Sequence, residues 1–206
     1  MLSVILIRCG TVATLTSCRS ANNAVVTPDK ARQSIVILFE TDVHCAIDGY
    51  AKMAGLRDAV ADTAWAALVS SGDFLQGGTS GAISHGQYIT NIMRAMHYDA
   101  VTLGNHEFDY GVPRMRELLD GFNAPVVCCN YTDMQGKRVY APYVIRNYGN
   151  RKVAFVGVLT PYTELKAEWF AFHDAEGQSV YTLHDQTYTD MVQQAVDKAR
   201  SEGAEI

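Results

Sequence analysis

From residue 34 onward, short continuous apolar runs alternate with longer stretches in which apolar residues recur every three or four positions. The first run, residues 34–39, is typical of a strand that is buried on both faces. A stretch with helical spacing follows at residues 47–61. The same reasoning predicts further strands at 65–69, 100–103, 125–129, 143–146 and 153–159, and further helices at 88–96, 113–119 and 188–201. Strands that alternate with helices in this way predict an α/β fold whose sheet is mostly parallel at its start.

The last two predicted strands are joined differently from the others. Only the segment NYGNRK separates them, and Gly149 and Asn150 within it are typical turn residues. This spacing predicts a β-hairpin.

Each of the first three predicted strands runs into a polar loop. The first enters ETDVHC, which contains Asp42 and His44, and the second enters SSGDFLQGG, which contains Asp73. The third enters LGNHEFDYG, with Asn105 and His106 directly after the strand. In an open α/β sheet, ligands bind outside the carboxyl ends of the strands, so we expect these side chains to build one shared site.

The residue types at these strand ends favour a metal. In an extended segment alternate residues share a face, so Asp42 and His44 are expected to bind one cation while Val43 turns into the core. Asp73 has two carboxylate oxygens and could bridge two ions, and Asn105 offers a neutral carbonyl oxygen. Oxygen and imidazole ligands suit Zn²⁺, Mn²⁺ or Fe rather than a thiolate site.

The motifs D-x-H, G-D and G-N-H-E, in this order, resemble those of the calcineurin-like metallophosphoesterases. The longer forms GDFLQGG and LGNHEFDYG are similar to the 5'-nucleotidase branch, and the likeness covers residues 34–206. It implies a metallophosphoesterase-type sheet sandwich flanked by helices, with two divalent ions. Asp42 and His44 would bind one ion, Asp73 would bridge both, and Asn105 would bind the second.

The resemblance also implies a catalytic His–Asp pair, which falls on His106 and Asp109. Three residues apart, Asp109 is close enough to orient the imidazole and to stabilise its charge. His106 could then stabilise the transition state or protonate the leaving oxygen. Asn105 and His106 would also contact the substrate, whereas Glu107 is expected to have a structural part.

Two further motifs of that family, a lone histidine after a later strand and a G-H-x-H sequence, do not occur in this chain. His173 and His184 lie in unrelated sequence surroundings. Residues 34–206 are therefore expected to be the N-terminal part of such a domain, without the nucleotide-binding domain of the branch. An unfinished sheet exposes an edge, which predicts self-association.

The composition excludes some classes of partner. The 206 residues carry a net charge of −5, and their charged residues are interspersed without a basic stripe, so nucleic acid is not an expected partner. Beyond the first 23 residues the cysteines are Cys45, Cys128 and Cys129. Since neighbouring strand residues point to opposite faces, these cysteines are predicted to be buried apolar side chains rather than a disulfide framework.

Residues 1–23 are apolar, then small, then polar, and contain no acidic residue. They resemble a secretory leader, and LTSC at residues 15–18 resembles the lipobox of bacterial lipoproteins. This pattern predicts export to the periplasm or cell surface, with a lipid anchor at Cys18. No apolar stretch reaches the roughly 18 residues that a membrane-spanning helix needs.

Taken together, the sequence predicts metal-dependent hydrolysis of a phosphate ester, in which two metals activate a hydroxide. The small-molecule substrate expected first is a nucleoside 5'-monophosphate. A hydrolase of cyclic nucleotides or nucleotide sugars would share every residue named above. A metal-binding fragment with little activity is the other alternative.

Overall fold

The computed structural model describes residues 2–7, 34–164 and 168–206. Within the predicted leader, only strand β1 (Leu2–Ile7) belongs to this part. The remainder of that segment, including the predicted lipidation site at Cys18, lies outside the described residues. Within the described ranges, every helix is too short or too polar to cross a membrane.

The main sheet has the strand order β1-β2-β3-β4. Strands β2 (Ile35–Glu40), β3 (Trp65–Ser70) and β4 (Ala100–Val101) are parallel, which confirms the predicted parallel start, and β1 pairs with β2 antiparallel. The strand predicted at 125–129 is reduced to isolated parallel bridges, Val101 with Val126 and Val127 with Ala141. All the parallel strands point the same way, so their carboxyl ends meet at one edge.

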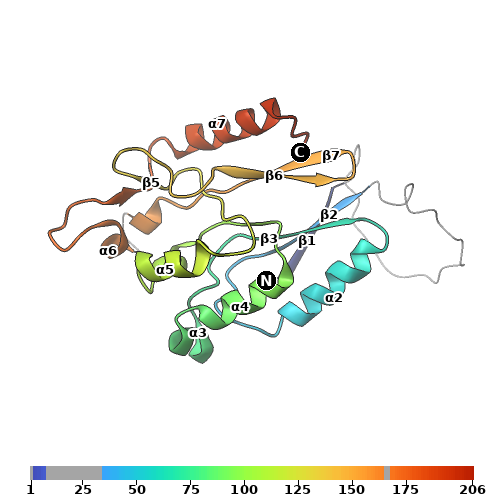
Figure 1. Ribbon diagram of the computed structural model, residues 1–206, viewed down its shortest axis with the longest axis horizontal. Coiled ribbons are helices and arrows are strands. Elements are labelled where there is room, and N and C mark those ends of the chain that lie inside the picture. The colour runs from blue at the N-terminus through green and yellow to red at the C-terminus, as the bar shows by residue number, and fades with distance from the viewer. Residues whose placement is uncertain (1, 8–33, 165–167) are drawn as a thin grey trace, which may run out of the picture.

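Helices cover one face of this sheet (Figure 1). Helix α2 (Tyr50–Ala61) packs on β2 and β3, and α4 (Gln87–Met96) lies beside α2. The core on this side contains the alternate strand residues and the buried sides of the helices, namely Val36, Leu38, Leu68, Met53 and Met93. The helix predicted at 113–119 is also present, as α5 (Val112–Leu119).

Helix α3 (Gly78–Ser84) was not predicted from the sequence. Its residues GTSGAIS combine two glycines with two serines, which favour turns over helices. Gly81 in this helix lies against Cys45, because a Cβ added there would be 2.7 Å from the Cys45 sulfur. Close packing on the loop after β2 therefore accounts for a helix that intrinsic propensity does not favour.

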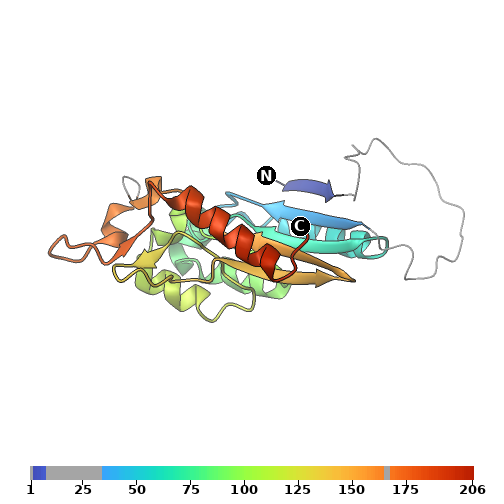
Figure 2. The same ribbon diagram turned by 90° about the horizontal axis from the view of Figure 1, so that it is seen from above.

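The opposite face of the sheet is covered by a second layer (Figures 1 and 2). The predicted hairpin is confirmed as β6 (Tyr143–Tyr148) and β7 (Arg151–Val156), and α7 (Tyr188–Ser201) packs on its outer side. A small second core joins the main sheet to the hairpin, made of Ile35, Ala67, Tyr148 and Val153. Because β2 contributes to both cores, its apolar run is continuous, as a strand buried on both faces requires.

Short elements complete the described fold. The 3₁₀ helix η1 (Asn105–Phe108) follows β4, and α6 (Trp169–Phe172) comes late in the chain. A two-stranded sheet pairs β5 (Thr132–Asp133) with β8 (Tyr181–Thr182). Cys45, Cys128 and Cys129 are all free and buried, which confirms their predicted role as apolar core side chains.

Candidate metal centre

The loop after β2 runs beside the loop after β3 and is hydrogen-bonded to it. The backbone N–H groups of Asp42, His44 and Cys45 donate to the carbonyls of Gly72, Asp73 and Phe74, at 3.2, 3.0 and 3.2 Å. These bonds continue the pairing of the two strands beyond their ends. They bring the first polar loop against the second, as the shared sheet edge predicts.

The backbone in these loops is not extended, which corrects one step of the sequence interpretation. Asp42, His44 and Asp73 have φ values of 54°, 46° and 57°, in the left-handed region. Alternation along a strand therefore does not place Asp42 and His44 on one face, and sharp turns do so instead. Val43 packs against the main core, as expected.

Asp42, His44 and Asp73 form a cluster in which their candidate ligand atoms all lie within 4.8 Å of one another. His44 Nδ1 lies 3.2 Å from the carbonyl oxygen of Gln76, which leaves Nε2 for another partner. Asp73 Oδ1 accepts a hydrogen bond from the backbone N–H of His106 at 2.8 Å, which leaves its second oxygen available. Two carboxylates and one imidazole are a donor set that fits a borderline divalent cation.

The loop after β4 lies directly against the loop after β3. A Cβ added at Gly104 would be 2.2 Å from Asp73 Oδ1, and one added at Gly72 would be 2.1 Å from the Gly104 nitrogen. Both positions therefore require glycine. This approach brings Asn105, the first residue of η1, to the loop that contains Asp73.

Glu107 lies beneath the loops and is completely buried. Its carboxylate accepts four backbone N–H bonds, from Gly104 at 2.5 Å, Asp73 at 2.8 Å, Phe74 at 2.8 Å and Leu75 at 3.1 Å. Burial raises the pKa of Glu107, and the backbone hydrogen bonds offset part of that rise. The structural part predicted for Glu107 is therefore a link between the second and third loops.

His106 and Asp109 form the pair that the sequence predicts. His106 Nδ1 lies 3.0 Å from Asp109 Oδ2, and the His106 ring meets the His44 ring edge-on at 4.9 Å between centroids. Burial acts to lower the pKa of His106, but the hydrogen bond and charge of Asp109, with the charge of Asp73, raise it on balance. The imidazole thus lies beside the cluster of Asp42, His44 and Asp73 and is oriented by a carboxylate.

The structure adds one residue that the sequence did not indicate. Glu168, buried at the start of α6, has its carboxyl group within 4.8 Å of the ligand atoms of His106 and Asp109. Only the fold brings it there, and no local motif surrounds it. The two later histidines are used elsewhere: His173 stacks on Trp169, and His184 Nε2 lies 2.8 Å from the Thr132 hydroxyl.

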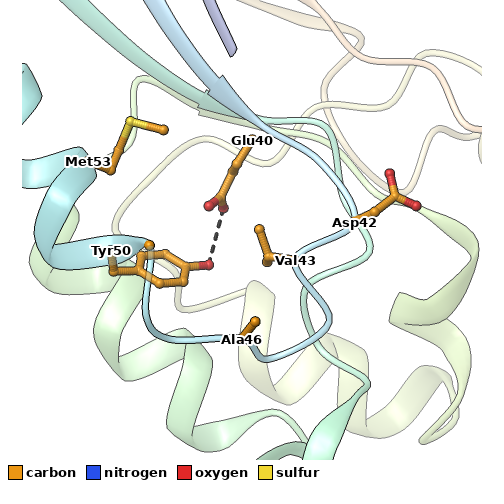
Figure 3. Close-up of a pocket in the computed structure, with 7 residues that line it drawn as sticks. Glu40, Asp42, Val43, Ala46, Tyr50 and Met53 are labelled. Atoms are coloured by element: carbon orange, nitrogen blue, oxygen red, sulfur yellow. Dashed lines mark hydrogen bonds between the residues drawn. The ribbon is translucent and has the colours of Figure 1, made fainter. Parts of the chain in front are cut away.

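A cavity of about 210 Å³ lies beside this cluster, between β2 and α2 (Figure 3). Buried Glu40 and Tyr50 point toward each other across it, and the Tyr50 hydroxyl donates to Glu40 Oε1 at 3.3 Å. Asp42 also lines the cavity, although its carboxylate points away from Glu40 and Tyr50 (Figure 3). Neither His44 nor Asp73 lines it, so the cavity and the candidate metal cluster share only Asp42.

The family model of the calcineurin-like phosphoesterases matches residues 35–196. The chain therefore belongs to this family.

Named relatives hydrolyse nucleotides. The trifunctional nucleotide phosphoesterase protein YfkN of Bacillus subtilis is 30% identical over 162 residues, covering 68% of this chain and 10% of the relative. A snake venom 5'-nucleotidase from Gloydius brevicauda is 27% identical over 154 residues, covering 63% and 26%. The chain thus spans only 10% of the length of the first relative and 26% of that of the second.

A solved structure supports the fold. The putative 5'-nucleotidase from Staphylococcus aureus superposes with a TM-score of 0.67 at 23% identity, covering 84% of this chain and 36% of that chain. The mixed α/β architecture with a parallel sheet and flanking helices is therefore that of the metallophosphoesterases, as predicted.

Proposed function

We propose that the chain carries the N-terminal half of a two-metal site that hydrolyses phosphate esters of nucleotides. The supporting observation is that the Asp42, His44 and Asp73 cluster adjoins the hydrogen-bonded His106–Asp109 pair, with the two histidine rings 4.9 Å apart. In this proposal Asp42 and His44 would hold one ion, Asp73 would be shared by both, and Asn105 would hold the second. Zn²⁺, Mn²⁺ and Fe all suit these ligands.

The chemistry divides between the ions and the protein. Divalent ions at such a site polarise the phosphoryl group and lower the pKa of bound water toward neutrality. Because His106 Nδ1 faces Asp109, its Nε2 is left to donate to the phosphoryl or leaving oxygen. Asp109 keeps the imidazole oriented and stabilises its positive charge.

The proposed substrate class rests on the relatives. A 5'-nucleotidase among them favours a nucleoside 5'-monophosphate. The Bacillus relative is a trifunctional nucleotide phosphoesterase, which supports a second candidate with a broader range of nucleotide esters. Cyclic nucleotides and nucleotide sugars, the alternatives that the sequence left open, belong to this second candidate. The proposal extends to export and lipid anchoring at Cys18, as the sequence predicts.

The test measures phosphate release from AMP by the 206-residue chain with added Mn²⁺, together with its metal content by mass spectrometry. Asp73→Asn is expected to lose the metal, and His106→Ala to keep the metal but lose turnover. Asp48→Asn serves as the matched control, because Asp48 is an exposed acid in the same loop as Asp42. Metal binding and turnover that survive in Asp73→Asn would contradict the proposed site.

A substrate panel separates the two candidates. A 5'-nucleotidase hydrolyses AMP faster than 2',3'-cyclic AMP or a nucleotide sugar, whereas comparable rates on all three favour the broader activity. A chain that binds metal without hydrolysing any of them would instead be the binding fragment that the sequence left open.

A further inference from the structure

Helix α6 is packed against η1 by three aromatic side chains. The Phe172 ring lies 5.0 Å from that of Phe108 and 5.7 Å from that of Tyr131, and the Phe108 and Tyr131 rings are 5.6 Å apart. All three side chains are completely buried. Phe108 immediately precedes Asp109, so this packing fixes the start of α6 relative to the His106–Asp109 pair.

The backbone of Glu168 is also fixed, because its N–H donates to the Thr163 carbonyl at 2.8 Å and its carbonyl accepts from the Ala171 N–H at 2.9 Å. Its side chain therefore reaches the catalytic pair from a rigid support. Glu168 is only 8% exposed. A buried carboxyl group in this position requires a partner.

Asp109 has one oxygen that needs such a partner. Oδ2 is used by His106 Nδ1, whereas Oδ1 is buried and has no hydrogen-bond partner among the described residues. The Glu168 carboxyl lies within 4.8 Å of the ligand atoms of both His106 and Asp109. Two ionised carboxylates repel each other, so a buried neighbouring pair retains one proton between them.

We propose that Glu168 is a positioning residue for His106. A carboxyl proton held between Glu168 and Asp109 bonds to Asp109 Oδ1, and this bond fixes the carboxylate that orients the imidazole. The proximity of the Glu168 and Asp109 carboxyl groups is a matter of geometry, whereas its catalytic purpose rests on the proposed function. Electrostatics support the arrangement: burial raises the pKa of Glu168 to about 7, and the neighbouring negative charge of Asp109 contributes to that rise.

The test compares two substitutions of similar size. Glu168→Gln can still donate, through its amide, to Asp109 Oδ1, whereas Glu168→Met fills a similar volume and cannot donate. Glu176→Ala is the control, because Glu176 is an exposed acid on the same stretch of chain. Unfolding midpoints of all variants are measured first to show that each is folded.

The primary readout is the ¹H–¹⁵N spectrum of the His106 imidazole at one fixed pH, which reports the hydrogen-bonded Nδ1–H. Wild type, Glu168→Gln and Glu176→Ala are expected to show this signal, and Glu168→Met is expected to lose or broaden it. An unchanged signal in a folded Glu168→Met variant overturns the proposal. So does its loss in a folded Glu168→Gln variant.

Kinetics provide the second readout. Glu168→Met is expected to lower kcat roughly 10-fold with little change in KM, as outer hydrogen-bond partners of active sites do, and Glu168→Gln is expected to restore most of it. If wild type itself has no turnover while the spectra behave as expected, the proposed function fails and the positioning role stands. If wild type hydrolyses substrate while the Glu168→Met spectrum matches that of wild type, the proposed function stands and the positioning role fails.

Discussion

Replacing Glu107 by glutamine tests whether a buried carboxylate holds the loops of the site together. The side chain is completely buried, and its two oxygens each accept two backbone N–H bonds. Glutamine has nearly the same shape but only one acceptor oxygen. Its amide nitrogen would therefore face two N–H donors from which it cannot accept hydrogen bonds.

The magnitude follows from this count. Two buried N–H groups lose their acceptor, and each unsatisfied donor costs about 1–3 kcal/mol. Relief of the buried charge returns part of this cost, since burial raises the pKa of Glu107. We therefore expect Glu107→Gln to lower the free energy of unfolding by about 2–4 kcal/mol.

Urea denaturation followed by circular dichroism measures the change, with metal content determined on the same samples. Glu117→Gln is the matched control, because Glu117 is an exposed glutamate whose carboxylate pairs with Arg114 at 2.7 Å. Such a surface pair contributes less than about 1 kcal/mol. If Glu107→Gln unfolds within about 0.5 kcal/mol of wild type, the carboxylate does not stabilise the loops and the reasoning is refuted.

Three further outcomes follow from the same structure. Gly104→Ala should abolish metal binding and cost about 1–3 kcal/mol of stability, because its Cβ would lie 2.2 Å from Asp73 Oδ1. The control is Gly55→Ala, which has no atom within 4 Å of its Cβ and should be neutral or stabilising. Chelation by EDTA should lower the Tm of wild type and leave that of Asp73→Asn unchanged. Burial raises the pKa of the Cys128 thiol from 9.0 to about 12. The folded state therefore holds this proton more tightly than the unfolded state does. In urea titrations, the stability advantage of wild type over Cys128→Ala should shrink by about 1 kcal/mol between about pH 8 and pH 10. An increase over this range would contradict the raised pKa.

The regular elements of the fold are predictable because their causes are local. The apolar run at β2 and the turn residues Gly149 and Asn150 each act within a few positions, and both predictions are confirmed. The sequence did not indicate α3, since its helix depends on packing against Cys45. The strand at residues 125–129 is shortened for the same kind of reason, because its neighbours along the sheet decide how much of it pairs.

The site also combines features that local sequence predicts with features that depend on tertiary packing. The position of Asp109 beside His106 follows from their spacing of three residues, and the structure places them in contact. Glu168 reaches the same pair only because Phe172 packs on Phe108, a contact between distant parts of the chain. No local feature of the sequence indicates such a residue.

The left-handed turns at Asp42, His44 and Asp73 bear on how the site would bind its ions. Non-glycine residues in this conformation cost on the order of 1 kcal/mol each, although aspartate and histidine tolerate it better than most. Here the bonds between the loops and the four N–H bonds to Glu107 hold this conformation. Because these bonds do not involve the proposed ligand atoms' free positions, we predict that the loops keep their conformation when metal is removed. This distinguishes the site from structural zinc centres, whose folding depends on the metal, and explains why chelation should lower the Tm without unfolding the chain.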